Sequence, residues 1–306
     1  MPASEVLART LRGLERIARD EVRSRLRINQ IAIGHRELRF SLPELAPELL
    51  ELGTVDDVFL VLAEVEGMSQ RRESLARLAS MSLDLDEAAH LLGRSGPRTF
   101  GVTASFLGRR NYNRFELEDA AAAAAGWRRV ARDGTLSLRV HVVGSVATVA
   151  VRVAQTPLHR RAYRVATVPG SVHPPLARAL ALLAGEPFVD PFCGAGTIPI
   201  EGSLAGLETR GSDIDPRAIE AARMNADAAG VAVPLSVADA AALGPAYCIV
   251  TNPPWGKAVR AAAAVALRAR RIVLLTAAPT ALEGVLYEQT VRVHGALATI
   301  TVAERP

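Results

Sequence analysis

The stretch "IVTNPPWGK", residues 249–257, ends an apolar run with an amide, two prolines and a large aromatic ring. The side-chain oxygen of Asn252 and the backbone carbonyl of Pro253 can accept hydrogen bonds from the exocyclic amine of a purine. Such bonds pull its nitrogen, whose lone pair is delocalised into the ring, toward tetrahedral geometry. Proline locks φ, so Pro253 and Pro254 fix the direction of this carbonyl. Trp255 offers a face on which an extruded base can stack. The alternative is a turn that only ends a strand.

A glycine-rich turn lies upstream, in "FVDPFCGAGTIPIE", residues 188–201. Asp190 ends a short apolar run, and Gly194 and Gly196 allow a ligand to approach the backbone closely. A helix starting at Thr197 would present free N–H groups to that ligand. The spacing is neither that of a dinucleotide fingerprint nor that of a phosphate-binding loop. A carboxylate at this strand tip suits an amino-bearing ligand, although a plain strand–helix connection could use the same turn.

Three further carboxylates follow the next two predicted strands. Asp213 closes the first of them, where it can accept hydrogen bonds from ribose hydroxyls. Asp215 precedes Pro216 and fits a helix N-cap with proline in the first helical position. Asp239 ends the third strand, where it could contact an adenine amino group or lie in a solvated loop. We therefore predict that Asp213 is a ligand and Asp215 a cap.

In this order, the motifs resemble those of class I methyltransferases that use S-adenosylmethionine. The resemblance implies that Asn252, Pro253, Pro254 and Trp255 form the catalytic tip, and that no metal is needed. Such tips serve enzymes that methylate adenine, guanine or the amide of glutamine. The resemblance also implies a cofactor site made by Asp190, Phe192, Cys193, Gly194, Gly196, Thr197, Asp213, Ile214, Asp239, Ala240 and Asn252.

The N-terminal half suggests the substrate. The stretch "SFLGRRNYNRFELEDAA" resembles the core of a THUMP domain, an RNA-binding module, and "TPLHRRAYR" resembles the segment that joins it to a methyltransferase domain. "LRGLERIARDEV" resembles the opening helix of the same family, the THUMP-containing RNA guanine-N2-methyltransferases. The resemblance implies N2-methylguanosine in tRNA, or alternatively in 23S ribosomal RNA. The sequence is also compatible with a non-catalytic RNA-binding or assembly factor and with a glutamine methyltransferase.

Charge is distributed unevenly along the 306 residues. The formal net charge is +4, and residues 1–170 carry 25 basic and 20 acidic side chains against 11 and 12 in residues 171–306. This asymmetry favours a polyanionic partner for the N-terminal half, although ordinary surface charge would also explain it. The candidate RNA-facing groups, which could instead lie on solvated faces or between domains, are Arg109, Arg110, Arg114, His159, Arg160, Arg161 and Arg164.

The remaining composition narrows the chemistry. Cys193 and Cys248 are the only cysteines, which excludes a disulfide scaffold and fits a reducing compartment. Neither lies where a thiol could attack a pyrimidine, so methylation at carbon 5 is not expected. The sequence has no metal-binding cysteine pattern, no signal peptide and no apolar run of the roughly 20 residues that span a bilayer. We expect a cytoplasmic, monomeric protein.

The predicted architecture is α/β. We expect an N-terminal ferredoxin-like domain over residues 1–66, a THUMP-like domain with its connecting segment over 67–167, and a Rossmann-like methyltransferase domain over 168–306. Alternation of strand and helix patterns in the last domain predicts a seven-stranded, mostly parallel sheet of order 3-2-1-4-5-7-6. Its last two strands should be antiparallel because only a tight turn joins them.

Several local elements are also predicted. Apolar residues from Leu7 to Ala18 at helical spacing indicate a first helix, and residues 71–93 and 280–289 read as helices. Asn113 and Glu116 fit a capping box. Residues 135–155 read as a hairpin bent at Gly144. A helix should start near Lys257. The stretch between Lys257 and Arg271 is shorter than the resemblance to the family would imply.

Overall fold

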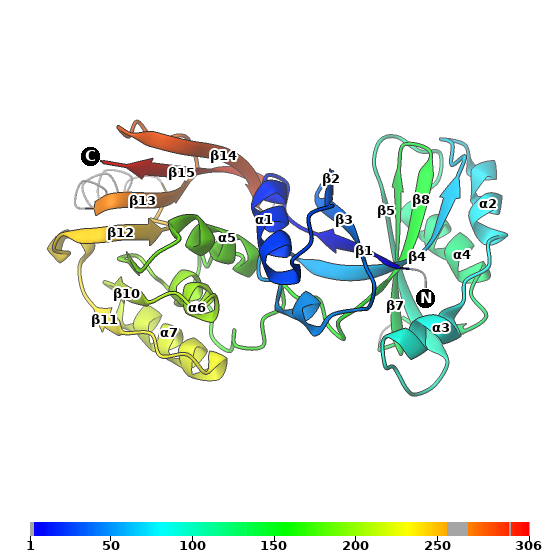
Figure 1. The fold of residues 1–306 in the computed structure, drawn as a ribbon, viewed down its shortest axis with the longest axis horizontal. Helices are drawn as coiled ribbons and strands as arrows, with labels where there is room; N and C mark the ends of the chain where they lie inside the picture. Colours follow the sequence, from blue (N-terminus) through cyan, green and yellow to red (C-terminus); the bar gives the residue numbers. More distant parts are fainter. Residues whose placement is uncertain (1–2, 132, 256–268, 294, 306) are drawn as a thin grey trace.

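Two β-sheets lie side by side in the computed structural model, which describes residues 3–131, 133–255, 269–293 and 295–305. In Figure 1, the sheet formed by C-terminal residues lies on the left with its helices, and the sheet formed by N-terminal residues lies toward the right. Helix α1 (Glu15–Leu26) lies between them.

The C-terminal sheet has seven strands in the order β11-β10-β9-β12-β13-β15-β14. Numbered from its own first strand, this order is 3-2-1-4-5-7-6, as predicted. All pairs from β11 to β13 are parallel, whereas β15 is antiparallel to both of its neighbours. The predicted Rossmann-like class is therefore confirmed. The strands are β9 (Phe188–Asp190), β10 (Thr209–Asp213), β11 (Leu235–Val237), β12 (Ala246–Thr251), β13 (Ala269–Thr276), β14 (Val285–Val293) and β15 (Ala296–Glu304).

Among the described residues, three helices and one short 3-10 turn accompany this sheet. Helix α5 (Pro174–Ala184) is buried along most of its length and shares one apolar core with β12, β13 and β15. Helices α6 (Thr197–Leu204) and α7 (Pro216–Ala229) follow β9 and β10, and the 3-10 turn η3 (Ala240–Ala242) follows β11. Each begins just beyond a strand's carboxyl end, and this connection brings the predicted ligands to one edge of the sheet.

The N-terminal sheet has eight strands in the order β2-β3-β1-β4-β8-β7-β5-β6. Strand β4 pairs with β1 on one side and β8 on the other, so the sheet continues from the N-terminal residues into the part predicted to resemble a THUMP domain. The boundary expected at 66/67 falls at the end of β4. The strands are β1 (Ser4–Arg9), β2 (Ala32–Gly34), β3 (Glu37–Leu42), β4 (Asp57–Glu66), β5 (Thr99–Phe106), β6 (Arg128–Arg129), β7 (Leu136–Val143) and β8 (Val146–Arg152).

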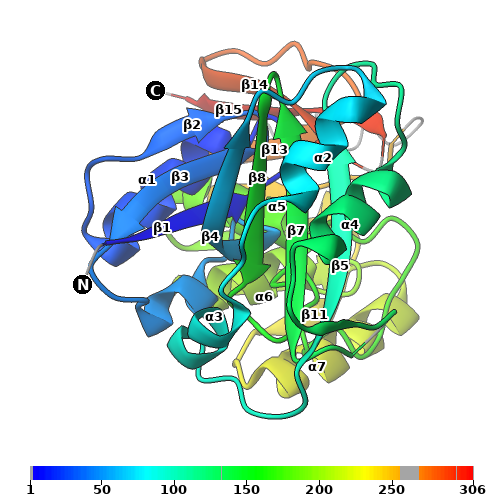
Figure 2. The ribbon, with the colours of Figure 1, turned by 90° about the vertical axis from the view of Figure 1, so that its right-hand side faces the viewer.

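Short helices cover one face of the second half of this sheet. In Figure 2, α2 (Leu75–Ala79) and α4 (Arg114–Ala123) lie over β5, β7 and β8, and their apolar residues share a core with those strands. The predicted capping box at the start of α4 is present. The Asn113 side chain accepts from the Glu116 backbone N–H, and the Glu116 carboxylate accepts from the Asn113 backbone N–H. The other helical elements are η1 (Pro47–Glu51), η2 (Arg72–Ser74) and α3 (Leu85–Leu91).

Three helix predictions need correction. The first helix is α1 and begins at Glu15, whereas Leu7 lies in β1, a strand buried between β3 and β4. Apolar residues on both faces of a central strand can imitate helical spacing over one turn. Residues 71–93 break into η2, α2 and α3.

The helix predicted over residues 280–289 is wrong, since strand β14 starts at Val285. Gly284 has φ +68°, and a Cβ there would lie 2.0 Å from the carbonyl oxygen of Glu304. The strong helix formers around it yield to pairing with β15, because the long antiparallel ladder outweighs propensity. The helix expected near Lys257 lies outside the described residues.

Candidate active site

The carboxyl ends of β10, β9 and β12 meet at one edge of the C-terminal sheet. These strands are adjacent and parallel, and they end at Asp213, Asp190 and Thr251 respectively. Ligands of open α/β sheets bind beyond this edge, where the strand order reverses. The sheet order therefore gathers the residues that the sequence motifs single out.

Asp190 is a buried and only partly satisfied carboxylate. One oxygen, Oδ1, accepts hydrogen bonds from the Thr251 hydroxyl at 2.6 Å and the Phe192 backbone N–H at 3.1 Å. The other, Oδ2, has no hydrogen-bond partner among the described residues. Burial raises the pKa of Asp190 from 3.8 to about 7, and the charge of Asp213 adds to the rise. A buried carboxylate with a vacant acceptor fits a cationic amino group, which would restore the charged form.

The turn after β9 depends on its glycines. Gly194 and Gly196 adopt φ values of +54° and +78°, in the left-handed region that disfavours other residues. A Cβ on Gly196 would also come within 3.0 Å of Ala222 in α7, so glycine allows α6 and α7 to pack closely. Cys193 and Thr197, on either side of this turn, are both buried.

Asp213 and Asp215 differ in role, although they are two residues apart. The Asp213 carboxylate accepts from the Gly194 N–H at 2.9 Å and the Asp215 N–H at 3.0 Å, so it braces the glycine turn against the tip of β10. Asp215 caps α7 by accepting from the N–H of Arg217 at 2.9 Å, which confirms the predicted cap. Ile214, between the two, leaves 68% of its surface exposed.

Asp239 ends the loop after β11. Its Oδ1 accepts from the Ala241 N–H at 2.8 Å and caps η3, while the residue as a whole is exposed. Ala240, next to it, is buried. Capping uses one lone pair of the carboxylate, so the predicted contact with an adenine amino group stays a prediction.

The Asn252 side chain is held from two directions. Its Nδ2 donates to the Gly170 carbonyl at 3.4 Å, and its Oδ1 accepts from the indole N–H of Trp255 at 3.1 Å. Pro253 is buried, whereas Pro254 is exposed and Trp255 leaves 45% of its surface exposed. The tip therefore presents an oriented amide beside an accessible aromatic ring.

The segment joining the two halves lies against this site, and the residue that fixes it was not singled out from the sequence. Asn225 in α7 donates to the carbonyls of Ala166 and Ala195 and accepts from the Ala166 N–H, each at 2.9 Å. It thereby ties the connecting segment to the glycine turn. An amide on the otherwise apolar buried face of α7 is a signal that could have identified it.

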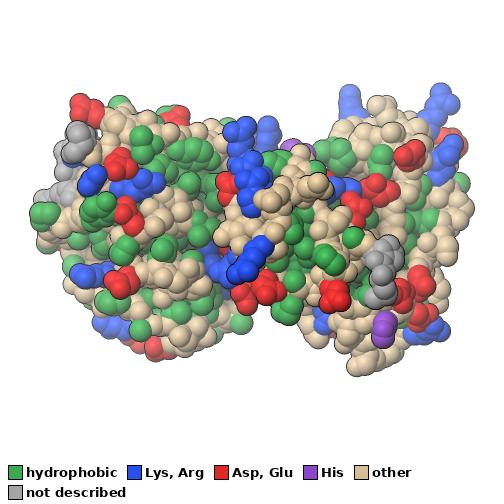
Figure 3. All heavy atoms as spheres, in the orientation of Figure 1, with side chains coloured by type: hydrophobic (Ala, Val, Ile, Leu, Met, Phe, Trp, Pro, Cys, Tyr) green, Lys and Arg blue, Asp and Glu red, His purple; other side chains and the backbone are tan. Residues whose placement is uncertain are grey.

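Some of the predicted RNA-facing groups are exposed, whereas others are half-buried or bonded to other parts of the protein. Arg109, Arg114 and Arg160 are exposed, whereas His159 and Arg164 are half-buried. Arg110 instead donates to the backbone carbonyls of Ser69 and Gly144. Figure 3 shows further basic side chains gathered over the middle of the molecule, where α1 lies and carries arginines in its last turn.

Arg161 takes part in a buried ionic network between the two halves. Its guanidinium contacts the Glu201 carboxylate at 2.7 Å and the Gly53 carbonyl at 2.7 Å. Glu201 is fully buried and also accepts from Arg178 at 3.0 Å and from the hydroxyl of Tyr163 at 2.9 Å. This places Arg161 in a contact between domains, a position that the sequence left open.

Both thiols are inert in this fold. Cys193 and Cys248 are buried, and burial raises the pKa of each, to about 12 for Cys248. In the described part of the chain, no group of three or more acidic, His or Cys side chains could hold a metal ion. No helix among the same residues is long and apolar enough to cross a membrane.

Comparison with known proteins finds a methyltransferase family model that matches part of this chain. Residues 161–271 match the model of the family UPF0020, described as an RMKL-like methyltransferase domain. The chain is 25% identical over 249 residues to the ribosomal RNA large subunit methyltransferase K/L of Shewanella baltica, covering 60% of this chain and 35% of that protein. It is 38% identical over 96 residues to the tRNA (guanine(10)-N2)-dimethyltransferase of Methanothermobacter thermautotrophicus, covering 29% of each. The chain thus spans about a third of the length of these curated relatives.

Solved structures share the whole fold. TrmN from Thermus thermophilus superposes with a TM-score of 0.82 at 24% identity, covering 99% of this chain and all of that one. A predicted N6-adenine-specific DNA methylase from Listeria monocytogenes gives 0.79 at 21% identity, covering 100% and 97%. At these identities the likeness concerns the fold alone, and it includes the N-terminal sheet as well as the C-terminal one.

Proposed function

We propose that this chain, whose residues 161–271 match the model of an RMKL-like methyltransferase domain, uses S-adenosylmethionine to methylate N2 of a guanosine in structured RNA, with tRNA as substrate. The observation that carries the proposal is the oriented Asn252 amide at the end of β12, next to the strand that ends in Asp190. An amide acceptor beside a cofactor turn suits methyl transfer to an amine.

The residues of this edge fit the cofactor. The vacant Oδ2 of Asp190 can accept a hydrogen bond from the amino group of the methionine moiety. Asp213 keeps lone pairs for ribose hydroxyls beyond its two backbone bonds, and the exposed Ile214 offers an apolar surface to the adenine. When bound, S-adenosylmethionine supplies an electrophilic methyl group on a sulfonium.

The catalytic tip acts on the amine of the substrate. Asn252 Oδ1 and the Pro253 carbonyl would accept hydrogen bonds from the two N–H groups of N2, which draws the nitrogen lone pair out of conjugation. As N2 gains the methyl group, the S–CH3 bond breaks to leave S-adenosylhomocysteine, and N2 loses one proton. The two hydrogen bonds strengthen as positive charge develops on the nitrogen, so they stabilise the transition state more than the ground state. Trp255 stacks on the flipped base.

The choice of guanosine and tRNA rests on three considerations. A relative matched over 96 residues bears the name of a tRNA guanine-N2 enzyme. The basic excess lies in residues 1–170, where exposed arginines can hold phosphates. Buried thiols with raised pKa values argue against attack on carbon 5 of a pyrimidine.

The product identifies the reaction. The protein is incubated with labelled cofactor and unmodified tRNA transcripts, the RNA is digested, and the labelled nucleoside is separated. We expect N2-methylguanosine. N6-methyladenosine or 5-methylcytidine would contradict the assigned base, and absence of label with intact cofactor binding would favour a non-catalytic RNA-binding protein.

Ribosomal RNA is the second candidate substrate, favoured by the 249-residue match to a ribosomal RNA methyltransferase. The same experiment with 23S ribosomal RNA fragments as a parallel substrate separates the two. Label that enters only the ribosomal RNA would replace tRNA in the proposal and leave the chemistry of Asn252 unchanged.

A further inference from the structure

A cavity of about 570 Å³ opens where the N-terminal sheet, the connecting segment and the β14–β15 turn meet. Six arginines and two aspartates are among the residues that line it. The arginines are Arg9, Arg12, Arg36, Arg139, Arg152 and Arg292, and the acids are Asp56 and Asp57. The lining therefore carries a strong positive excess at neutral pH.

Both acids of the cavity already have cationic partners. Asp57 accepts from Arg152 at 2.6 Å. Asp56 accepts from His173 at 2.7 Å and lies 3.9 Å from Arg36. The positive excess of the cavity is therefore not neutralised by these two carboxylates.

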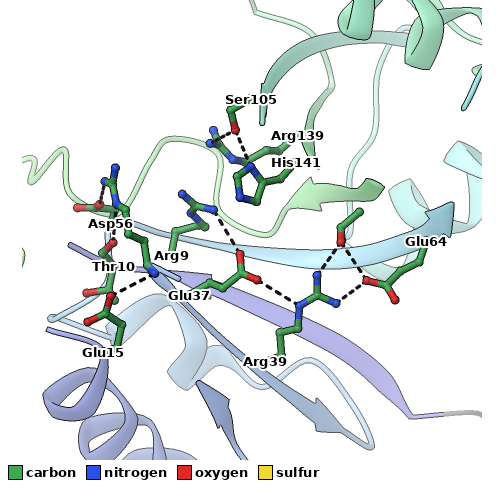
Figure 4. A network of polar contacts seen from close by, with 12 residues as sticks. Arg9, Thr10, Glu15, Glu37, Arg39, Asp56, Glu64, Ser105, Arg139 and His141 are labelled. Carbon is green, nitrogen blue, oxygen red and sulfur yellow. Dashed lines mark hydrogen bonds and ion pairs between the residues drawn. The ribbon is translucent and has the colours of Figure 1, made fainter. Parts of the chain in front are cut away.

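Among the cavity arginines that are not exposed, Arg139 is the one without an ion pair to a carboxylate of the described residues. It extends from β7 into the space that Arg9 enters from β1 (Figure 4). Arg9 has the carboxylate of Glu37 at 3.3 Å, but Arg139 donates only to the hydroxyl of Ser105, at 3.1 Å. Its Nε is buried without a hydrogen-bond partner, and no carboxylate of the described residues lies within 4.0 Å of its guanidinium.

Burial and mutual repulsion make this arrangement unfavourable in isolation. Burial and, next in size, the charge of Arg139 lower the pKa of Arg9 to about 10. Burial also lowers the pKa of Arg139, as do the charges of Arg36 and Arg152, and the charges of Asp57 and Glu37 offset this lowering only in part. A buried cation that is compensated only in part costs stability unless an anion neutralises it.

We propose that this cavity binds a backbone phosphate of the RNA substrate, with Arg139 and Arg9 as the contacting groups. The inference rests on the proposed function for the identity of its ligand. Guanidinium forks match phosphate oxygens with paired hydrogen bonds. A phosphate in the cavity would neutralise part of the excess charge around Arg139.

The position of the cavity gives this phosphate a positioning role. Arg292 comes from the methyltransferase sheet, whereas Arg9 and Arg139 come from the N-terminal sheet. The connecting segment links the cavity to the site, because His173 lines the cavity and the nearby Gly170 carbonyl holds Asn252. A phosphate bound here is fixed relative to both halves, which sets how the rest of the RNA reaches Trp255.

The test compares Arg139→Gln with Arg98→Gln. Arg98 is an exposed arginine of the same half, paired with Asp86 and absent from the cavity lining, so its loss removes the same charge. Binding of an unmodified tRNA transcript is measured across a salt series, with cofactor affinity and Tm alongside. We expect Arg139→Gln to weaken RNA binding roughly 10-fold or more, and to reduce the salt slope by about 0.7–0.9.

Cofactor affinity should be unchanged in Arg139→Gln, and its Tm equal to or above that of the wild type, since a buried repulsion is removed. Affinity for RNA within twofold of the wild type, or no weaker than that of Arg98→Gln, would overturn the proposal. A lower Tm would also count against it, because Arg139 would then be a structural residue.

A second arm replaces RNA with inorganic phosphate and with AMP. Tight binding of either that depends on Arg139, together with unchanged RNA affinity, would assign the cavity to a small anion and overturn the RNA assignment. The readouts also separate this inference from the proposed function. Loss of RNA affinity in Arg139→Gln supports the cavity even if the methylated nucleoside is not N2-methylguanosine, whereas a correct product with unchanged affinity refutes only the cavity.

Discussion

The indole N–H of Trp255 lies 3.1 Å from Oδ1 of Asn252, and it donates a hydrogen bond to the oxygen assigned to the substrate amine. The bond uses one lone pair of the amide oxygen and fixes the rotation of the side chain. Substrate must therefore share the oxygen with the indole or displace it. The two residues act as one unit in which the aromatic ring orients the amide as well as offering a stacking face.

Replacement of Asn252 by Ala should abolish turnover. Its hydrogen bond to the amine strengthens in the transition state, so the substitution should lower kcat. Cofactor affinity should stay within a few-fold of that of the wild type. Single-turnover kinetics with labelled cofactor and calorimetric titration measure the two quantities. If Asn252→Ala retained most of its kcat, the amide would not polarise the amine.

Two variants of Trp255 serve as matched controls for that experiment. Trp255→Phe keeps a stacking face and removes the N–H donor, so we expect RNA affinity near that of the wild type and a reduced kcat. Trp255→Ala also removes stacking, worth roughly 1–3 kcal/mol per base, and should weaken RNA binding. Equal RNA affinity of the Phe and Ala variants would mean that the ring does not stack on a base.

Asp213→Ala and Asp215→Ala should separate cofactor binding from helix capping. Asp213 lies at the tip of β10 and braces the Gly194 N–H, so its loss should weaken S-adenosylmethionine binding more than the loss of Asp215. Asp215→Ala removes the α7 cap and should lower the free energy of unfolding by about 1 kcal/mol. Calorimetric titration and denaturant unfolding of both variants test this, and equal losses of cofactor affinity would contradict the assignment.

Asp190 should make both stability and cofactor binding depend on pH. Its pKa is raised from 3.8 to about 7 by burial, so the folded state holds the proton more tightly than the unfolded chain. The bound proton therefore adds to the free energy of unfolding. This contribution is fully present below pH 3.8 and is lost as pH rises through about 7. The Tm of Asp190→Asn, whose amide does not titrate, should therefore rise relative to the wild type between pH 5 and pH 8.

Cofactor affinity should move in the opposite direction. The ionised carboxylate attracts the amino group of the cofactor, so wild-type affinity should increase from pH 6 to pH 8, while that of Asp190→Asn stays weak and changes less. Parallel Tm curves for the two proteins, or equal pH profiles of affinity, would mean that Asp190 does not titrate in this range.

The order of the C-terminal sheet could be predicted because most of its strands are marked by signals in their own residues and in the turns that follow them. Short apolar runs such as β9 and β12 end in polar residues, and the turns and helices between them carry their own signals, including the cap at Asp215. Right-handed crossovers then leave few possible topologies. The ligands at the strand tips could be predicted for the same reason.

The misplaced elements depend on strand pairing that their own composition does not reveal. Residues 285–289 form a strand because β15 pairs with them, and their own composition favours a helix. Leu7 belongs to β1 because β3 and β4 enclose it. Charged contacts between domains join residues far apart in sequence, so spacing along the chain gave no sign that Glu201 would bind Arg161.

Arg160 and Arg161 are adjacent, and they should separate RNA binding from stability. Arg160 is exposed, so Arg160→Ala should weaken tRNA binding, reduce its salt slope by about 0.7–0.9 if it contacts a phosphate, and leave Tm within about 2 °C of the wild type. Arg161→Ala leaves the fully buried Glu201 with one cation fewer, and breaking such a pair typically costs about 3–5 kcal/mol. Its Tm should fall by several degrees, because Arg178 and Tyr163 compensate only in part. Filter binding and thermal unfolding of the two variants give the readouts. If Arg161→Ala lost RNA affinity without any loss of Tm, the residue would face the RNA and the interface assigned to it would be wrong.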